Sequence, residues 1–290
     1  MKCRMKPRRF LMTLAVAAGL LFPAQAAFGI NVAEEADTIF NAVASGKPIP
    51  LLDVPEAEKT EGNAYLIQEI LHKKMMQASK DSIVGFKAGV TAEPQIKRFK
   101  APSPASAPLF KSGLIPVTDT KKALTIKSFP GIMLETEIAF KTAKAIKKPV
   151  ASKAELQGMI KSVHACIEIP RIYFADLSRV FFFDLTAAGV GTHKFIIGPP
   201  RDVKSIDLDG AAVVLTRGNE TVNSGKGVDA MGGQWDALLW LVNNVVARNG
   251  GVEKDQYLLT GALGAMIPGK PGSYVATFPF EKISFTITEK

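Results

Sequence analysis

Apolar side chains recur at helical spacing in two segments near the start of the chain. The segments 33–45 and 63–77 carry apolar residues three or four positions apart, at Ala36, Ile39, Phe40 and Val43 and at Tyr65, Ile67, Ile70, Leu71 and Met75. Residues at this spacing lie on one face of a helix. The pattern therefore predicts two amphipathic helices.

After residue 81 the pattern changes to short β-branched runs separated by glycine and proline, which are typical of strands. The runs cover residues 83–86, 123–128, 132–140, 165–169, 195–197, 211–216, 257–261, 274–278 and 283–287. Two predicted helices interrupt them. Residues 152–162 begin with Ser152 and Glu155 at capping-box spacing, and residues 235–249 end before Gly250, a helix stop signal. The pattern predicts a mainly β domain over residues 81–290, preceded by a helical segment over residues 27–80.

The first 26 residues have the three parts of a secretory signal peptide. A basic head is followed by an apolar run over residues 10–22 and by the small-residue exit Ala24-Gln25-Ala26. This run is shorter than the roughly 20 residues that span a bilayer. We predict cleavage after Ala26, a periplasmic or secreted location, and no membrane segment in the mature chain.

Charge and cysteine content narrow the function classes. The whole chain has 36 Lys+Arg and 27 Asp+Glu, but five of the basic residues and none of the acids lie in the signal peptide, so the mature chain has a net charge of +4. This balance does not favour nucleic-acid binding, which needs a concentrated basic surface. Cys166 is the one cysteine left after cleavage, so the mature chain cannot form an internal disulfide.

Three glutamates suggest a metal site. Glu135 and Glu137 are two positions apart on the predicted strand 132–140, so their side chains share one face. Glu168 lies in an apolar strand, where an unpaired carboxylate is expensive. A divalent cation would cancel the repulsion between the carboxylates. A solvated strand face carrying two surface acids is the alternative for the Glu-x-Glu pair.

Several motifs, taken in order, resemble one known family. They are Ala64-Tyr65-Leu66-Ile67-Gln68, Gly85-Phe86-Lys87-Ala88-Gly89-Val90-Thr91, Gly113-Leu114, Glu135-Thr136-Glu137-Ile138-Ala139-Phe140, Ile167-Glu168-Ile169, Phe195-Ile196-Ile197-Gly198, Trp240-Leu241-Val242-Asn243 and Leu259-Thr260-Gly261. With this order and spacing the chain resembles the 2-keto-4-pentenoate hydratase and 4-oxalocrotonate decarboxylase branch of the fumarylacetoacetate hydrolase superfamily.

The resemblance implies a fold and a cofactor. The fold is α+β, a mixed β-roll like the C-terminal domain of fumarylacetoacetase, with N-terminal and flanking helices. In such a fold Glu135, Glu137 and Glu168 hold Mg²⁺ or Mn²⁺. The resemblance also implies a homo-oligomer built from dimers.

The resemblance further implies an enzyme that acts on a small 2-oxo acid, as a hydro-lyase or a related carbon–carbon lyase or hydrolase. Lys87 is the expected catalytic residue, which would hold the substrate carboxylate or relay a proton. Leu114, Thr192 and Thr260 are the expected substrate contacts.

The chain departs from the family pattern in four segments, among them Leu109-Phe110 before Gly113-Leu114 and Ala262 after Thr260-Gly261, and two departures bear most on the site. The third acid is followed by Ile169-Pro170-Arg171-Ile172, and Ala188-Gly189-Val190-Gly191 precedes the strand at Phe195 where family members carry polar residues. Two hypotheses therefore stay open. The first is an exported, metal-dependent hydratase or lyase. The second is a non-catalytic periplasmic binding protein that keeps the fold and the metal site.

Overall fold

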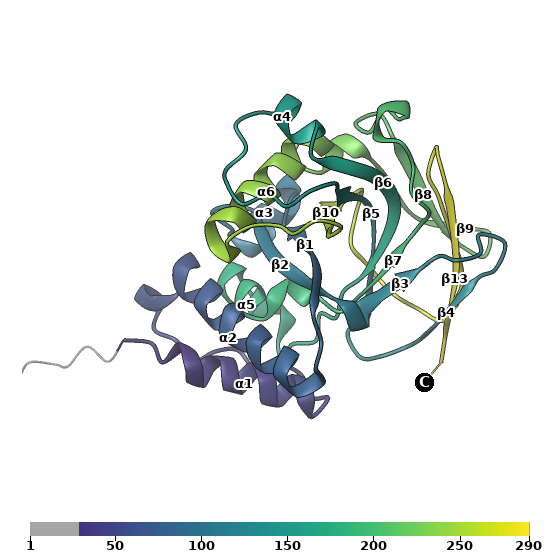
Figure 1. Cartoon of the computed structure of the whole chain (residues 1–290). Coiled ribbons are helices and arrows are strands. Elements are labelled where there is room, and N and C mark those ends of the chain that lie inside the picture. Colours follow the sequence, from purple (N-terminus) through teal and green to yellow (C-terminus); the bar gives the residue numbers. More distant parts are fainter. Residues whose placement is uncertain (1–28, 290) are drawn as a thin grey trace, which may run out of the picture.

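The computed structural model describes residues 29–289, and these residues form two β-sheets and a set of helices packed around them (Figure 1). The architecture is α+β with curled, mixed sheets, as the sequence predicts. The predicted signal peptide lies outside the described residues and stays a prediction. Among the described residues, none of the helices combines the length and the apolar character needed to cross a bilayer.

The α-helices are α1 (Val32–Ala44), α2 (Glu61–Ser79), α3 (Glu93–Phe99), α4 (Lys153–Gln157), α5 (Phe182–Ala187) and α6 (Gln234–Asn249). Helix α2 begins where the Thr60 side chain accepts a hydrogen bond from the Asn63 backbone N–H at 3.1 Å. Helix α6 ends at Gly250, whose φ of +74° is a left-handed conformation that glycine adopts without strain. The helices predicted over 33–45, 63–77 and 235–249 are confirmed.

The helix predicted over residues 152–162 is wrong in its second half. Helix α4 ends at Gln157, and strand β6 starts at Ile160. Residues 160 and 162 pair with the end of β5, through Thr142↔Ile160 and Lys141↔Ser162. Hydrogen bonds to a neighbouring strand therefore outweigh the local helical pattern here.

The larger sheet has eight strands among the described residues and mixes parallel and antiparallel pairs. In spatial order its strands are β2 (Ala105–Phe110), β1 (Ile83–Gly89), β10 (Tyr257–Ala262), β5 (Met133–Thr142), β6 (Ile160–Ile169), β7 (Lys194–Ile197) and β3 (Leu114–Pro116), and β11 (Ile267–Pro268) pairs with β5 outside this path. The smaller sheet runs β4 (Leu124–Lys127), β13 (Lys282–Thr288), β12 (Gly272–Thr277), β8 (Ala212–Arg217) and β9 (Glu220–Lys226). The sequence pattern missed the short strands β2, β3, β9 and β11.

Both faces of the central strand β5 are buried, one in the main apolar core and the other around the glutamates. Ile138 and Phe140 on one face belong to the main apolar core, together with Leu241 of α6. Because side chains alternate along a strand, Glu135 and Glu137 point to the opposite face. This second face is closed by an apolar cluster that includes residues of α1, α2 and α5. Helix α5 reaches this face through Leu185, and α2 and then α1 pack behind α5 (Figure 1).

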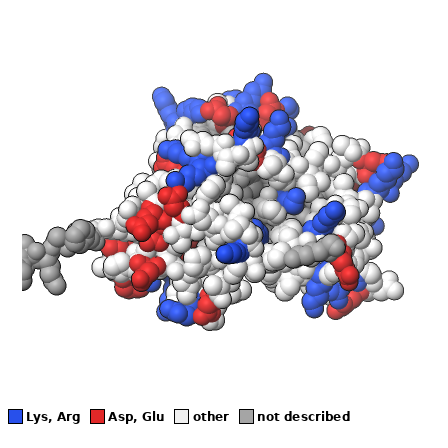
Figure 2. Space-filling view, turned by 90° about the horizontal axis from the view of Figure 1, so that it is seen from below, with Lys and Arg blue, Asp and Glu red and all other residues white. Residues whose placement is uncertain are grey.

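The surface carries both signs of charge. Figure 2 shows lysine and arginine interspersed with aspartate and glutamate over the face seen from below. Over the described surface as a whole, several lysines form exposed ion pairs, such as Lys73 with Glu69 at 2.6 Å and Lys161 with Asp255 at 2.8 Å. No single sign dominates the face in Figure 2.

Candidate metal centre

The three glutamates predicted as metal ligands meet at one point of the larger sheet. Glu135 lies directly opposite Glu168 on the neighbouring strand, and Glu137 follows two positions along β5. One carboxylate oxygen from each of the three lies within 4.8 Å of the others. The three residues are only 8%, 1% and 1% exposed. The reading of Glu135 and Glu137 as a solvated surface pair is therefore wrong.

Lys87 joins the three carboxylates from strand β1. In the sheet register Lys87 pairs with Leu259 of β10, which pairs with Ala139 of β5. Residues paired in this way point to the same face, so Lys87 faces the glutamates. Its ammonium group forms an ion pair with Glu168 Oε1, and the lysine is 2% exposed.

Gly261 holds Glu137 in place through its backbone. Its N–H donates a hydrogen bond to Glu137 Oε2 at 2.9 Å. The register of β10 shifts at this point, and Gly261 has a φ of +108°. A Cβ atom here would lie 2.2 Å from Thr91 Oγ1. Only glycine fits both the backbone conformation and the space, which explains the glycine of the Leu259-Thr260-Gly261 motif.

Burial and mutual repulsion perturb the charges of the site. Burial raises the pKa of Glu135 to about 7, the Glu168 carboxylate adds to the rise, and Lys87 opposes it. Burial, again with Glu168 and Glu135, raises the pKa of Glu137. For Lys87, burial lowers the pKa, but the Glu168 carboxylate and the other two acids outweigh it, so the pKa is raised. Lys87 therefore stays protonated at neutral pH.

The donor set fits a hard divalent cation. Glu137 Oε1 and Glu168 Oε2 are buried and have no hydrogen-bond partner among the described residues. In each of these two glutamates, one oxygen contacts the protein and the other has no partner. Glu137 Oε2 accepts from Gly261, and Glu168 Oε1 pairs with Lys87. Three carboxylates and one ammonium carry a formal charge of −2, which one divalent ion neutralises. Carboxylate oxygens are ligands suited to Mg²⁺ and Mn²⁺.

A small cavity of about 30 Å³ opens beside Lys87 and Glu135. It has room for a water molecule or two. The rest of its wall comes from Gly89, Val90, Gln95, Phe99, Pro170, Ile172, Leu185, Val190 and Met266. Apart from Gln95 these residues offer no side-chain hydrogen-bonding groups.

Two residues of this wall have a strained backbone. Val90 and Val190 have φ values of +57° and +52°. A β-branched residue in this left-handed conformation costs of order 1–3 kcal/mol. Strain of this kind is common where the backbone must hold a functional group at a fixed place. Here it positions both valine side chains in the cavity wall.

The expected substrate contacts lie elsewhere. The Thr260 hydroxyl donates to Gln234 Oε1 at 2.6 Å, and it lies 3.1 Å from the Ile138 carbonyl oxygen, on the face packed against α6. Leu114 packs against an apolar cluster that includes Phe195. Thr192 lines two other cavities. None of the three lines the cavity beside Lys87. In the case of Thr260 the reason is the bulge in β10, which brings the Gly261 N–H to Glu137 and leaves Thr260 on the other face.

Two further residues belong to the site, Gln95 and Thr91, and neither was predicted from the sequence. Gln95 lines the cavity together with Glu135, and its side chain lowers the pKa of that carboxyl against the larger effect of burial. Thr91 is 4% exposed and packs against Gly261. Thr91 is the last residue of the motif that contains Lys87, so it could have been predicted from the sequence. Gln95 lies in helix α3, which the sequence pattern did not predict.

Sequence relatives of the chain are enzymes. The chain is 26% identical over 240 residues to a 2-keto-4-pentenoate hydratase of Paraburkholderia xenovorans, which covers 82% of this chain and 87% of the relative. It is 25% identical over 248 residues to a 4-oxalocrotonate decarboxylase of a Pseudomonas species, covering 83% and 89%. No protein-family model matches the chain.

Solved structures share the fold. A 4-oxalocrotonate decarboxylase from Pseudomonas putida, complexed with magnesium and adipate, superposes with a TM-score of 0.80 at 20% identity, over 88% of this chain and 97% of that one. A fumarylpyruvate hydrolase from Pseudomonas aeruginosa, complexed with Mn²⁺ and pyruvate, gives 0.55 at 13% identity, over 71% and 89%. The resemblance read from the sequence motifs is confirmed: the relatives are hydratases and decarboxylases, and the structural neighbours belong to the fumarylacetoacetate hydrolase family.

Proposed function

We propose that this protein is a divalent-metal-dependent hydratase or related lyase that acts on a small 2-oxo acid. The observation that carries the proposal is the buried cluster of Glu135, Glu137 and Glu168 with Lys87 beside it, at the wall of a cavity. Four charged side chains buried together are costly to a fold, and a site for an ion and an anionic substrate explains why they are there. The enzyme relatives support the same conclusion.

Glu135, Glu137 and Glu168 would hold the ion. A bound Mg²⁺ or Mn²⁺ would act as a Lewis acid on the 2-oxo group of the substrate and so favour the enol form. Gly261 keeps the Glu137 carboxylate in position through its N–H, and Lys87 does the same for Glu168. With one oxygen of Glu137 and one of Glu168 held, the other oxygen of each is oriented before any ligand arrives.

Lys87 is the polar group of the protein best placed to act on a substrate. Its ammonium has three donor positions, one of which is used by Glu168. Because Lys87 lines the cavity, the remaining hydrogens can bond a substrate oxygen there. A lysine whose pKa is raised serves as a carboxylate anchor or as a proton donor, and it is poorly suited to act as a base.

The apolar wall keeps bulk water away from this chemistry. The apolar residues around the cavity include four that are each more than nine-tenths buried: Val90, Ile172, Leu185 and Val190. Exclusion of water strengthens the ion pair and the hydrogen bonds inside the site. A hydratase with such a wall must admit one water together with its substrate.

Turnover by the purified protein is the direct test. The protein and Mg²⁺ are incubated with 2-hydroxypenta-2,4-dienoate, 4-oxalocrotonate and an acylpyruvate, and ultraviolet absorbance follows the loss of each. We expect turnover of at least one of them, which disappears with EDTA and in Glu137→Gln. Glu253→Gln, which removes the charge of an exposed carboxylate paired with Lys147, is the matched control and should keep full activity.

A non-catalytic metal-dependent binding protein is the second candidate. It is favoured by the cavity of about 30 Å³, whose wall offers few polar side chains to orient a reacting group. This candidate predicts Mg²⁺-dependent binding of oxalate, a non-reactive mimic of the 2-oxo acid head, without turnover of any substrate in the panel.

We also propose that the protein is exported. The proposal rests on the basic head, apolar run and small-residue exit of residues 1–26. Expression of the full chain in a bacterial host should yield a periplasmic product whose N-terminal sequence starts at Ala27. A cytoplasmic product that retains Met1 would contradict this.

A further inference from the structure

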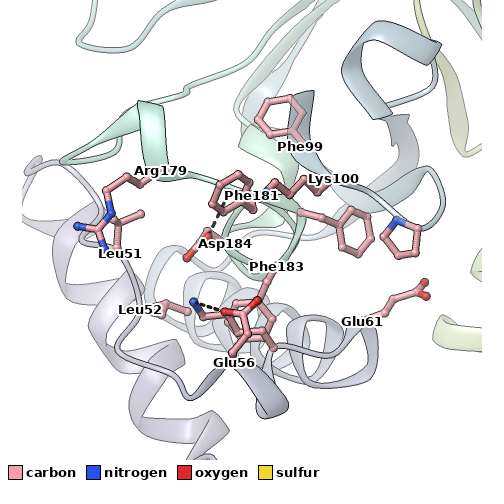
Figure 3. A pocket seen from close by; sticks show the side chains of 13 residues that line it. Leu51, Leu52, Glu56, Glu61, Phe99, Lys100, Arg179, Phe181, Phe183 and Asp184 are labelled. Carbon is pink, nitrogen blue, oxygen red and sulfur yellow. Dashed lines mark hydrogen bonds and ion pairs between the residues drawn. The ribbon is translucent and has the colours of Figure 1, made fainter. Parts of the chain in front are cut away.

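A large pocket lies next to the small cavity of the metal centre. It has a volume of about 540 Å³ and is lined by Leu51, Leu52, Glu56, Lys59, Glu61, Phe99, Lys100, Pro102, Arg179, Phe181, Phe182, Phe183 and Asp184 (Figure 3). Sites for small organic ligands usually measure about 300–1,000 Å³. The large pocket falls in this range, whereas the cavity at the metal centre, at about 30 Å³, falls far below it.

Phe99 is the wall between the two spaces, because it lines both of them. Helix α5 is the second shared wall. Its Leu185 lines the metal cavity, while Phe182 and Phe183 line the large pocket. A ligand that enters the metal cavity from the large pocket therefore passes the Phe99 side chain, which is only partly buried.

Helix α3 carries Phe99 as its last residue. It lies between Val90 and Lys100, whose φ values of +57° and +49° mark sharp changes of chain direction. The Arg98 guanidinium holds its end by donating hydrogen bonds to the Leu177 carbonyl at 2.8 Å and the Val180 carbonyl at 3.2 Å.

The acids of the large pocket are already engaged. Glu56 forms an ion pair with Lys59 at 3.2 Å, and Glu61 pairs with Arg248 at 2.5 Å. Asp184 Oδ2 accepts a hydrogen bond from the backbone N–H of its own helix start at 3.2 Å. Because these acids already have partners, a ligand in the pocket would contact mainly its aromatic and cationic groups.

The pocket surface includes phenylalanine rings and two cations, Lys100 and Arg179. The Lys100 ammonium lies over the Phe181 ring, 4.4 Å from its centroid, and Phe181 is 36% exposed (Figure 3). Among the described residues, neither Lys100 nor Arg179 has an acidic partner within 4.0 Å. An aryl ring placed in this pocket would gain apolar contacts with the phenylalanines and a cation–π contact with Lys100.

We propose that the large pocket receives the tail of the substrate, and that the preferred substrates are 2-oxo acids whose far end carries an aryl group. The inference rests on the proposed function, since the head of such a molecule would occupy the metal centre. The apolar cavity wall at Ile172, Leu185 and Val190, and Phe99 as the divider, form the path between head and tail.

Binding of matched 2-oxo acids tests the tail pocket. Isothermal titration with Mg²⁺ compares oxalate and 2-oxobutanoate, which provide a head only, with 2-oxo-4-phenylbutanoate and 2-oxo-6-phenylhexanoate. We expect at least one phenyl compound to bind about ten-fold or more tightly than 2-oxobutanoate, because burial of a ring strengthens binding by about this amount. Phe181→Ala should reduce the ratio of phenyl-compound affinity to 2-oxobutanoate affinity about three- to ten-fold. Its oxalate affinity should stay unchanged, which also shows that the variant is folded.

Leu177→Ala is the control. Leu177 is an exposed apolar residue close to Phe181 along the chain, but it does not line the pocket. It should change none of the affinities. Oxalate binding with no gain from any phenyl tail, or with a gain that Phe181→Ala does not reduce, would overturn the tail pocket alone. An absence of Mg²⁺-dependent oxalate binding would overturn the proposed function together with this inference.

A tail with a second carboxylate provides the last comparison. If 2-oxoadipate bound more tightly than the phenyl compounds and lost that advantage in Arg179→Gln, the pocket would select an anionic tail. That result would contradict an aryl specificity.

Discussion

Replacing Glu137 by glutamine should weaken metal binding and stabilise the metal-free protein at the same time. The three carboxylates lie within 4.8 Å of one another. At an effective dielectric constant of about 20, each pair of like charges at this distance costs at least about 3 kcal/mol. Glu137→Gln removes two such repulsions and one attraction to Lys87, so roughly one repulsion is relieved.

The amide reduces this gain but keeps the local contacts. Its oxygen can still accept the Gly261 N–H. Its NH₂ group has the carboxylates of Glu135 and Glu168 nearby as acceptors, and an amide hydrogen that finds no partner among them costs about 1–3 kcal/mol. We therefore expect a net stabilisation of up to about 2 kcal/mol in EDTA at pH 8. The pKa of Glu137 is raised above its ordinary value of 4.5. The ionised Glu137 carboxylate therefore destabilises the folded protein only as the pH rises above this value. The stabilisation should shrink towards pH 5.

Two measurements check both halves of the prediction. Urea unfolding in EDTA at pH 5 and pH 8 gives the change in the free energy of unfolding. Calorimetric titration with Mg²⁺ and Mn²⁺ gives the affinity, which should fall roughly 100-fold or more, beyond the usual effect of altering an outer-shell group. Wild-type metal affinity in Glu137→Gln would refute the ligand assignment. A loss of several kcal/mol in EDTA would refute the reasoning about repulsion.

Three further substitutions have distinct expected results. Lys87→Met should abolish turnover but retain Mg²⁺ binding, and in EDTA it should lose about 3–5 kcal/mol because Glu168 is left buried without its partner; urea unfolding with and without Mg²⁺ measures this. Burial lowers the pKa of His72 to about 3, so below pH 6.5 the unfolded state binds a proton that the folded state does not. Wild type should therefore lose about 2 kcal/mol more than His72→Gln between pH 8 and pH 5, and equal losses would count against a neutral buried histidine. Gly261→Ala should cost about 1–3 kcal/mol and weaken Mg²⁺ binding, because the new Cβ meets Thr91; adding Thr91→Ala should recover part of the stability.

The local pattern was enough to predict most of the secondary structure and the identity of the acids. Helices α1, α2 and α6 and most strands were predicted close to their observed bounds, because each carries a regular alternation of apolar residues. The short elements β2, β3, α3 and α5 were missed. Strand β2 and helix α5 are buried on all sides and so show no alternation, and β3 and α3 have too few residues to show a clear period.

The sequence by itself determined that Glu135 and Glu137 share a face and that Glu168 lies in an apolar strand, because both facts follow from residue spacing and composition. Only the tertiary structure decided that Lys87 pairs with Glu168, that Gly261 and not Thr260 serves the site, and that Phe99 divides two pockets. These relations depend on strand order, on a register shift and on the packing of a short helix. Each of these is set by hydrogen bonds and contacts between residues far apart in the chain, which no local pattern contains.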